Sequence, residues 1–202
     1  MVREGRVIAF EAWPFILLGL CLALLGWFFL GPLAGLGALV LVVLCLIYFR
    51  DPRRPVPASP RAVLSPVDGV VTGIETNEDE DGSWLVIHLS VDRFGAWSFR
   101  SPTEGKVMGL RPVSGQDGRG LWLRTDENDD ITVGLAGPAR PAWVRPVAFA
   151  SVGERLAQGQ RSGYRRLAHT ARVAVPLNSL LRVAAGERVK AGTDILAELV
   201  HD

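Results

Sequence analysis

The chain has 202 residues, of which 49% are hydrophobic, and its 22 Lys and Arg against 21 Asp and Glu leave a net charge of +1. This length allows one ordinary domain with an additional segment, and the near-neutral charge excludes the global electrostatic signature of a nucleic-acid-binding protein. The two cysteines, Cys21 and Cys45, both lie in apolar runs, so a disulfide scaffold is excluded. Together with only three histidines, they give no pattern for a metal site.

An uncharged apolar run covers residues 12–49. It is about twice as long as the roughly 20 residues that one bilayer crossing requires, and a Leu-Gly-Pro sequence at 30–32 interrupts it. We therefore predict that residues 1–49 form a membrane anchor in which two short helices, at about 13–30 and 33–49, make a hairpin. One long, tilted helix is the alternative.

Arginines flank both ends of this run. Arg3 and Arg6 precede it, and Arg50, Arg53 and Arg54 follow it. Because an excess of Lys and Arg marks the cytoplasmic side of a membrane, we predict that both termini and the globular domain face the cytoplasm.

Residues 50–62 are rich in proline and arginine, which predicts a stiff, basic linker whose arginines lie near lipid headgroups. Residues 63–202 show short alternating runs, such as 84–90 and 172–176, separated by Gly, Pro, Asp and Asn. This pattern is typical of β-strands joined by turns. The sequence therefore predicts a β domain over 63–202.

Two internal repeats refine that prediction. SPVDGVVTGI at 65–74 matches SPTEGKVMGL at 101–110, and a shared G-E-R pattern occurs at 152–160 and 185–193. Paired repeats of this kind indicate two interlocked β halves. The predicted fold class is mainly β, a sandwich-like or half-barrel domain that follows an N-terminal two-helix transmembrane hairpin.

Basic residues are concentrated in the second half of the domain. Residues 138–190 contain ten Lys and Arg and two Glu. Such a surface suits anionic lipid or phosphate, and an ordinary solvated surface is the alternative explanation.

Several segments, taken in order with the apolar hairpin, resemble the short, bacterial-type phosphatidylserine decarboxylases. They are YFRDPRRPVP (48–57), LSPVDGVV (64–71), RSPTEGKV (100–107), VGERLAQGQRSG (152–163) and VAAGERVKAGTDILAEL (183–199). The resemblance covers nearly the whole chain and implies a protein of the bacterial inner membrane.

The resemblance also implies an unusual cofactor. Members of this family convert the serine of a Gly-Ser pair in their own chain into a pyruvoyl group, with help from an aspartate and a histidine. The pyruvoyl group then serves as the electron sink when the substrate loses CO₂, a role that other enzymes give to a bound cofactor.

Carried over residue by residue, the family aspartate corresponds to Asp68, whereas the family histidine corresponds to Trp97 and the Gly-Ser pair to Ala168 and His169. An indole does not accept a proton at neutral pH, and an imidazole has no hydroxyl with which to form the required ester. We therefore expect no cofactor, because a pyruvoyl group cannot form at His169. Thr170, one residue further on, is a weak substitute.

Other roles follow for the neighbouring residues. Asp68 is the remnant of the family's catalytic aspartate, or else a turn residue that caps backbone amides. Arg165 and Arg166 flank the altered cleavage position and are candidate lipid-binding residues, because a phosphodiester headgroup needs such donors.

The sequence thus predicts a phosphatidylserine-decarboxylase-like inner-membrane protein linked to phosphatidylserine and phosphatidylethanolamine metabolism. We expect it not to cleave itself, to be catalytically impaired and to retain membrane phospholipid as its partner. An active decarboxylase with an altered centre and a membrane-tethered, protein-binding adaptor are the alternatives. Nucleic acid is not expected as a partner, and homo-oligomers or protein partners stay open.

Overall fold

A computed structural model gives the structure of the protein. It describes residues 7–79, 82–112, 119–138, 141 and 144–200. The chain divides into two units, Met1–Arg53 and Arg54–Asp202, which are taken in turn.

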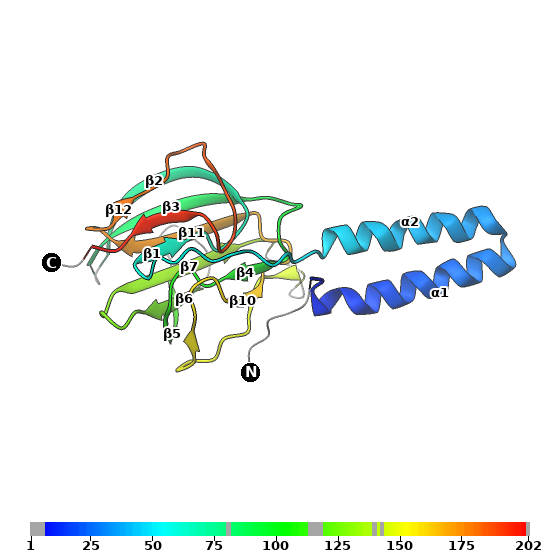
Figure 1. The fold of residues 1–202 in the computed structure, drawn as a ribbon, viewed down its shortest axis with the longest axis horizontal. Coiled ribbons are helices and arrows are strands. Elements are labelled where there is room, and N and C mark those ends of the chain that lie inside the picture. The colour runs from blue at the N-terminus through cyan, green and yellow to red at the C-terminus, as the bar shows by residue number, and fades with distance from the viewer. Residues whose placement is uncertain (1–6, 80–81, 113–118, 139–140, 142–143, 201–202) are drawn as a thin grey trace. The chain divides into compact units, whose positions relative to one another are not determined.

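The first unit contains two apolar helices that run side by side (Figure 1). A 3-10 turn, η1 (Phe10–Ala12), leads into α1 (Trp13–Phe29), and α2 (Pro32–Tyr48) follows after Gly31. Gly31 has a φ of 99°, a conformation that glycine adopts without strain. The predicted break between two helices is therefore confirmed, and a single long helix is wrong. The helical stretch Phe10–Phe29 has 20 residues and is long and apolar enough to cross a membrane, whereas α2 is shorter.

Glycines bring the two helices close together. A Cβ atom added to Gly19 would lie 2.6 Å from Cγ2 of Val42, and one added to Gly35 would lie 3.0 Å from the side chain of Trp27. Small residues of this kind allow helix backbones to approach closely in a lipid environment, where apolar side chains gain little from contacting each other.

The second unit is built from short strands. They are β1 (Ala62–Leu64), β2 (Gly69–Asp79), β3 (Gly82–Val91), β4 (Ser98–Arg100), β5 (Gly105–Pro112), β6 (Arg119–Arg124), β7 (Asp130–Ala136), β8 (Val147–Ala148), β9 (Arg155–Leu156), β10 (Arg161–Tyr164), β11 (Thr170–Pro176), β12 (Leu180–Leu181), β13 (Arg188–Val189) and β14 (Ile195–Glu198).

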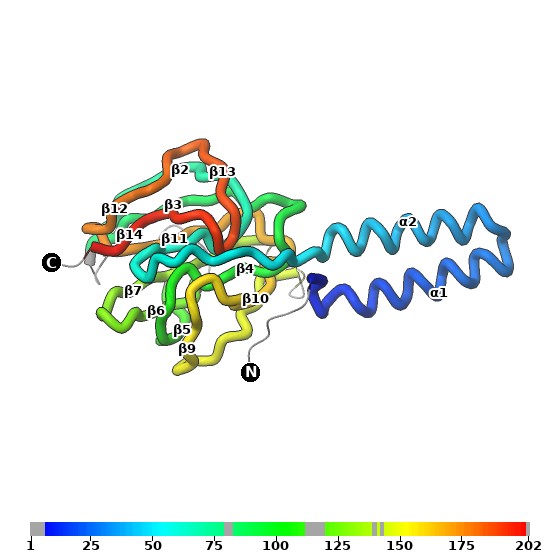
Figure 2. The backbone as a smooth tube through the Cα atoms, in the orientation of Figure 1, coloured from blue at the N-terminus to red at the C-terminus, as the bar shows by residue number. Residues whose placement is uncertain are grey.

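Eight of these strands form one curled, antiparallel sheet in the order β13-β2-β3-β11-β7-β6-β5-β9 (Figure 1). Two three-stranded sheets, β1-β14-β12 and β4-β10-β8, accompany it, and β1 and β14 can be followed side by side in Figure 2. The arrangement confirms the predicted half-barrel of mainly β structure.

The sequence repeats correspond to a repeat in structure. The hydroxyl of Ser65 donates to the carbonyl of Val67 at 2.7 Å, and the hydroxyl of Ser101 donates to that of Thr103 at 2.8 Å. Both β2 and β5 then carry a bulge, after Val71 and after Val107 in turn. Each repeat therefore builds the same turn and bulged strand.

The two halves also bond to each other reciprocally. Leu64 N donates to Pro102 O at 2.7 Å, and Arg100 N donates to Pro66 O at 2.9 Å. The two halves are thus interlocked, as the repeats predict, and the eight-stranded sheet has matching strands on either side of the β11–β7 pair.

One hydrophobic core fills the space between the sheets. Alternate residues of each strand point into it, as period-2 patterning requires. On β3 these are Leu85, Ile87 and Leu89, and on β11 they are Val173 and Val175. The opposite face of β3 and β11 is mixed, with His88 and Arg172 beside the buried apolar residues Val86 and Ala174.

Candidate functional site

Asp68 is the centre of a buried cluster of hydrogen bonds. Its side chain is 11% exposed, and one carboxylate oxygen accepts from Ala96 N at 2.7 Å while the other accepts from Ala191 N at 2.8 Å. Arg54 binds both oxygens, with 2.8 Å between its second terminal nitrogen and Oδ2. Asp68 therefore joins the linker, the loop after β3 and the turn before β14.

The same contacts set the charge of Asp68. Burial on its own would raise the pKa of this carboxyl group, but the hydrogen bonds from Arg54, Ala191 and Ala96 and the charge of Arg54 outweigh it. The pKa of Asp68 is held below its usual range, so the carboxylate stays ionised. Of the two roles considered for Asp68, the remnant of a catalytic aspartate and a turn residue that caps amides, the structure shows amide hydrogen bonds, and both amides come from distant segments rather than from its own turn.

Arg54 is a site residue that the sequence analysis assigned differently. It was predicted to lie near lipid headgroups with the other linker arginines, but its side chain is only 16% exposed and forms the ion pair with Asp68. A proline-rich segment reads as a linker, and nothing in its sequence indicates that one of its arginines reaches a carboxylate 14 residues away.

Trp97 lies in the loop that Asp68 anchors, between β3 and β4. It is 4% exposed, and its neighbour Ala96 donates to Asp68. Gly95 is the point of closest approach, because a Cβ atom there would lie 2.6 Å from Cβ of Asp68. The backbone beside Trp97 is therefore fixed against Asp68, and the indole at this position has no nitrogen that accepts a proton.

Arg165 holds this loop from the other side. It is 2% exposed, and its guanidinium donates to Ala96 O at 2.8 Å, Arg93 O at 2.8 Å and Gly95 O at 3.2 Å. The guanidinium also lies 5.7 Å from the ring centroid of Trp97. Arg165, which the sequence suggests as a lipid-binding residue, is thus buried and bonded to the carbonyl groups of this loop, which it positions.

The altered cleavage position comes directly before β11. Ala168 is 5% exposed, whereas His169 and Thr170 are exposed. The carbonyl of His169 accepts from Val91 N at 2.9 Å, and Thr170 is paired in register with Ser90 of β3. Hydroxyl groups therefore lie next to this position but not on it.

These residues meet because two strands end together. Asp92 N donates to the carbonyl of Asp68 at 2.8 Å, and the neighbouring Val91 N donates to that of His169. Asp68, Trp97, Ala168 and His169, to which the resemblance assigns the family aspartate, histidine and Gly-Ser pair, are thus gathered at one end of β2, β3 and β11, as a single site requires.

Exposed apolar and basic side chains border this end of the sheet. Phe94 is 61% exposed at the tip of the loop, and Leu167 is 43% exposed beside Arg166. The guanidinium of Arg166 donates to the carbonyl of Arg145 at 3.2 Å, and both Arg145 and Arg93 are exposed. Arg166 thus keeps a place at the surface, unlike Arg165.

Comparison with known proteins agrees with this geometry. The family described as phosphatidylserine decarboxylase matches residues 41–125. A phosphatidylserine decarboxylase proenzyme from Burkholderia ambifaria is 34% identical, with 96% of each chain covered. One from Nitrosomonas europaea is 35% identical over 95% of each chain, and one from Burkholderia vietnamiensis is 32% identical over 96%. The chain belongs to the phosphatidylserine decarboxylase family.

Family membership overturns one expectation. Phosphatidylserine decarboxylases depend on a pyruvoyl group, and the relatives are named proenzymes. The expectation that this protein has no cofactor is therefore wrong, because it conflicts with the family to which the chain belongs. Ala168 and His169, the position that the resemblance assigns to the Gly-Ser pair, do not fit the family's route to that group, because they supply no hydroxyl. Thr170 carries the first hydroxyl along the chain.

Proposed function

We propose that this member of the phosphatidylserine decarboxylase family binds aminophospholipid at the bacterial inner membrane, and that its self-cleavage and decarboxylation are strongly impaired. The observation that carries the proposal is the single end of the sheet at which Asp68, Trp97 and His169 occupy the family's three functional positions. The name of the family indicates the class of lipid. The replacements at Trp97 and His169 are the reason to expect impaired activity.

The surface around the site supports lipid binding. Phe94 and Leu167 offer exposed apolar groups, and Arg93, Arg145 and Arg166 offer positive charge beside them. An apolar tip surrounded by arginines suits the boundary between acyl chains and anionic headgroups. In this proposal the β unit faces the cytoplasmic leaflet.

Impaired processing follows from the chemistry of the two replacements. Self-cleavage needs a nucleophilic hydroxyl next to the carbonyl that it attacks and a base to take its proton. His169 lacks the hydroxyl, Trp97 lacks the basic nitrogen, and Asp68 is occupied by Arg54 and two amides.

An active decarboxylase with an altered centre is the second candidate. One observation favours it. Thr170 follows His169, and the carbonyl oxygen of His169 accepts a hydrogen bond from Val91 N at 2.9 Å. A donor at that oxygen is the kind of group that stabilises a developing negative charge.

The mass of the denatured protein tests the proposal. We expect purified full-length protein to give predominantly one chain of about 21.9 kDa. The triple variant Trp97→His, Ala168→Gly, His169→Ser should split into two chains and react with a carbonyl reagent, and Trp97→Phe alone should behave as the natural sequence does. Efficient splitting of the natural chain near 168–170, abolished by Thr170→Val, would establish the second candidate instead.

Lipid retained by the same preparation separates the proposal from a protein-binding adaptor. Native mass spectrometry in detergent should show phosphatidylserine retained in preference to phosphatidylcholine. Arg166→Gln should weaken this retention about fivefold, the effect of about 1 kcal/mol for one charge near an anionic surface. Arg188→Gln, an exposed arginine on β13, is the matched control, and equal retention of both lipids in every variant would favour the adaptor.

A further inference from the structure

Residues 54–58, the first of the second unit, form a strap of irregular structure on the β domain. Arg54 reaches inward from the strap, and its side chain, 16% exposed, binds Asp68. Val56 contacts the domain at Gly159, where an added Cβ atom would lie 2.6 Å from Cγ2 of Val56, and yet Val56 is 41% exposed. The strap is thus a surface segment that Arg54 fixes to the interior of the domain.

The strap and the loop after β3 bind the same carboxylate oxygen. Oδ2 of Asp68 accepts from Arg54 at 2.8 Å and from Ala96 N at 2.7 Å. Oδ1 accepts from Arg54 and from Ala191 N. A buried carboxylate without its counter-charge is strongly unfavourable, so it would turn toward solvent or take up a proton, and either change weakens its bond with Ala96. The strap therefore supports the loop through Asp68.

Comparison of the two sequence repeats shows that Arg54 adds a connection to the repeated fold. Glu104 occupies the position in the second repeat that Asp68 occupies in the first, and it binds Arg155 of a G-E-R turn at 2.9 Å. The equivalent of Arg155 in the other G-E-R turn is Arg188. Asp68 instead binds Arg54, which lies outside both repeats. The strap is thus tied to the candidate site by a bond that the repeats do not require.

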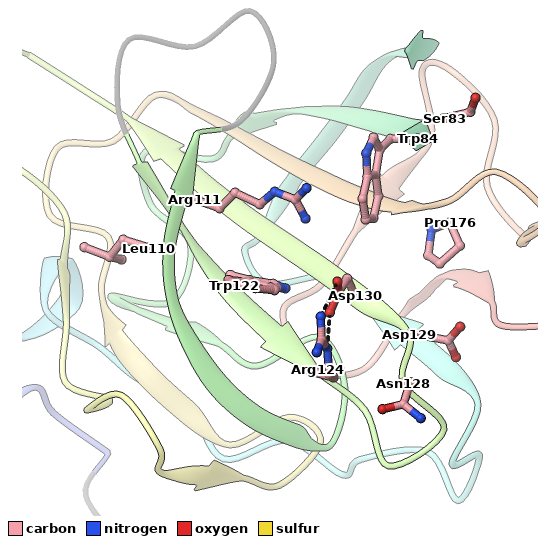
Figure 3. Close-up of a pocket in the computed structure, with 10 residues that line it drawn as sticks. All are labelled: Ser83, Trp84, Leu110, Arg111, Trp122, Arg124, Asn128, Asp129, Asp130 and Pro176. Atoms are coloured by element: carbon pink, nitrogen blue, oxygen red, sulfur yellow. Dashed lines mark hydrogen bonds and ion pairs between the residues drawn. The ribbon is translucent and has the colours of Figure 1, made fainter. Parts of the chain in front are cut away.

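Another arginine–aspartate pair illustrates a local ion pair. Arg124 and Asp130 lie opposite each other on β6 and β7, beside a surface hollow, and are joined by two hydrogen bonds of 2.7 and 2.9 Å (Figure 3). Asp130 begins β7, whereas Ala136, at the other end of that strand, accepts from His169 N. This pair therefore joins neighbouring strands away from the candidate site and serves as a comparison for Arg54.

We propose that Arg54 is a positioning residue that couples the strap to the loop at 92–97. With the strap docked, Asp68 holds Ala96 in place, and the loop presents Phe94 at its tip. With the strap released, Asp68 loses its counter-charge and the loop opens. Because coupling between two elements is reciprocal, opening of the loop also favours release of the strap. The consequence for lipid rests on the proposed function, whereas the coupling itself does not.

Hydrogen exchange of the full chain in phosphatidylcholine nanodiscs tests the coupling in one direction. Arg54→Met should accelerate exchange of the amides at 92–97 about tenfold, an ordinary size for coupling between two elements. Arg54→Lys, which keeps the charge but not the bidentate geometry, should give a smaller acceleration. Arg124→Met removes the comparison pair and should leave 92–97 unchanged. No acceleration in Arg54→Met, or an equal acceleration in Arg124→Met, would overturn the proposal.

A spin label on the strap tests the opposite direction. The label is attached to Ala58→Cys, at an exposed position, in a chain that also carries Cys21→Ala and Cys45→Ala. Arg165→Met perturbs the loop from its other side and should raise the mobile fraction of this label. A control label at Leu177, which is 47% exposed and follows the far end of β11, should not change. If the label at Ala58 does not respond to Arg165→Met, the strap and the loop are independent and the proposal fails.

Nanodiscs that contain phosphatidylserine separate this proposal from the proposed function. A lipid that contacts Phe94 should favour the closed loop, so exchange at 92–97 should slow and the label at Ala58 should lose mobility. If this lipid changes neither, while Arg54→Met and Arg165→Met act as expected, lipid binding at the site is contradicted and the coupling stands. If it slows exchange at 92–97 without affecting the label, the proposed function stands and the coupling is contradicted.

Discussion

Asp68 shows how a carboxylate from a catalytic motif can serve as a structural anchor. It accepts hydrogen bonds from Arg54, Ala96 and Ala191, which belong to three segments far apart in the sequence. An ionised, buried carboxylate with all of these partners is strongly favoured over a protonated one. In this protein its role is to hold the candidate site together.

Asp68→Asn should therefore destabilise the protein by about 3 kcal/mol at neutral pH, because it leaves Arg54 without its buried counter-charge. The pKa of Asp68 is lower in the folded state than in the unfolded state. Its stabilising contribution is fully present above the unfolded value of about 4 and disappears as the pH falls through the lower folded value. Thermal unfolding of the natural and variant chains should thus converge on acidification.

Asp126→Asn is the control for this prediction. Asp126 also binds an arginine, Arg155, but both side chains are more than half exposed. An exposed pair contributes little to stability, so this variant should melt close to the natural protein at every pH. Equal losses for the two variants would contradict the assignment of Asp68 as a buried anchor.

At the scale of single residues, the sequence indicates which side chains belong to the site but not which groups they bind. The sequence left two roles open for Asp68, a remnant of the catalytic aspartate or a turn residue that caps backbone amides, and the structure shows that it accepts two amides. The roles of Arg54 and Arg165 were missed, because an arginine in a proline-rich linker or beside a functional motif gives no sign of being buried. Their partners are carbonyls of the loop between β3 and β4 and a carboxylate just before β2, which only the three-dimensional fold brings near.

At the scale of elements, the loop between β3 and β4 is held by two buried side chains, Asp68 on one side and Arg165 on the other. Arg165 donates to three of its carbonyls, at Arg93, Gly95 and Ala96. Hydrogen bonds from a charged donor are among the stronger ones in proteins. The order of this loop, and with it the place of Trp97, is supplied in part by β10 and the turn that follows it.

Arg165→Met should consequently loosen the loop while the sheet remains folded. We expect hydrogen exchange of the backbone amides at 92–97 to become about tenfold faster, which corresponds to about 1.4 kcal/mol of local opening. Amides in the middle of β3 and β11 should keep their protection. Arg166→Met is the control, because the Arg166 side chain donates to the carbonyl of Arg145 and not to this loop in the bonds described. This variant should leave the exchange rates of the amides at 92–97 unchanged. Faster exchange at 92–97 in both variants would contradict the assignment.

The elements themselves were largely predictable, because the repeats are written in the sequence. The S-P turns at 65–74 and 101–110 and the G-E-R turns at 152–160 and 185–193 recur as paired structures with matching hydrogen bonds. Glu154 and Glu187 accept from Ser151 N and Ala184 N in the same way. The order of eight strands was not predictable, since alternation identifies a strand but not its neighbour.

At the scale of the whole molecule, the arginines at both ends of the apolar run predict the topology. Reporter fusions at residues 1 and 202 should both indicate the cytoplasm, because Arg3 and Arg6 precede the first helix and three further arginines follow the second. Reporters on opposite sides of the membrane would show that only Phe10–Phe29 crosses it.

The position of β11 has a consequence for any chain break beside it. This strand lies between β3 and β7 and is bonded to both along its length, while β13 and β14 are bonded to β2 and β1. A cut near 168–170 would therefore leave two polypeptides woven into one sheet. The smaller one, although it contains neither α1 nor α2, would be held to the piece that contains them by strand pairing and by the shared hydrophobic core, so breakage of the backbone and loss of the fragment would be separate events.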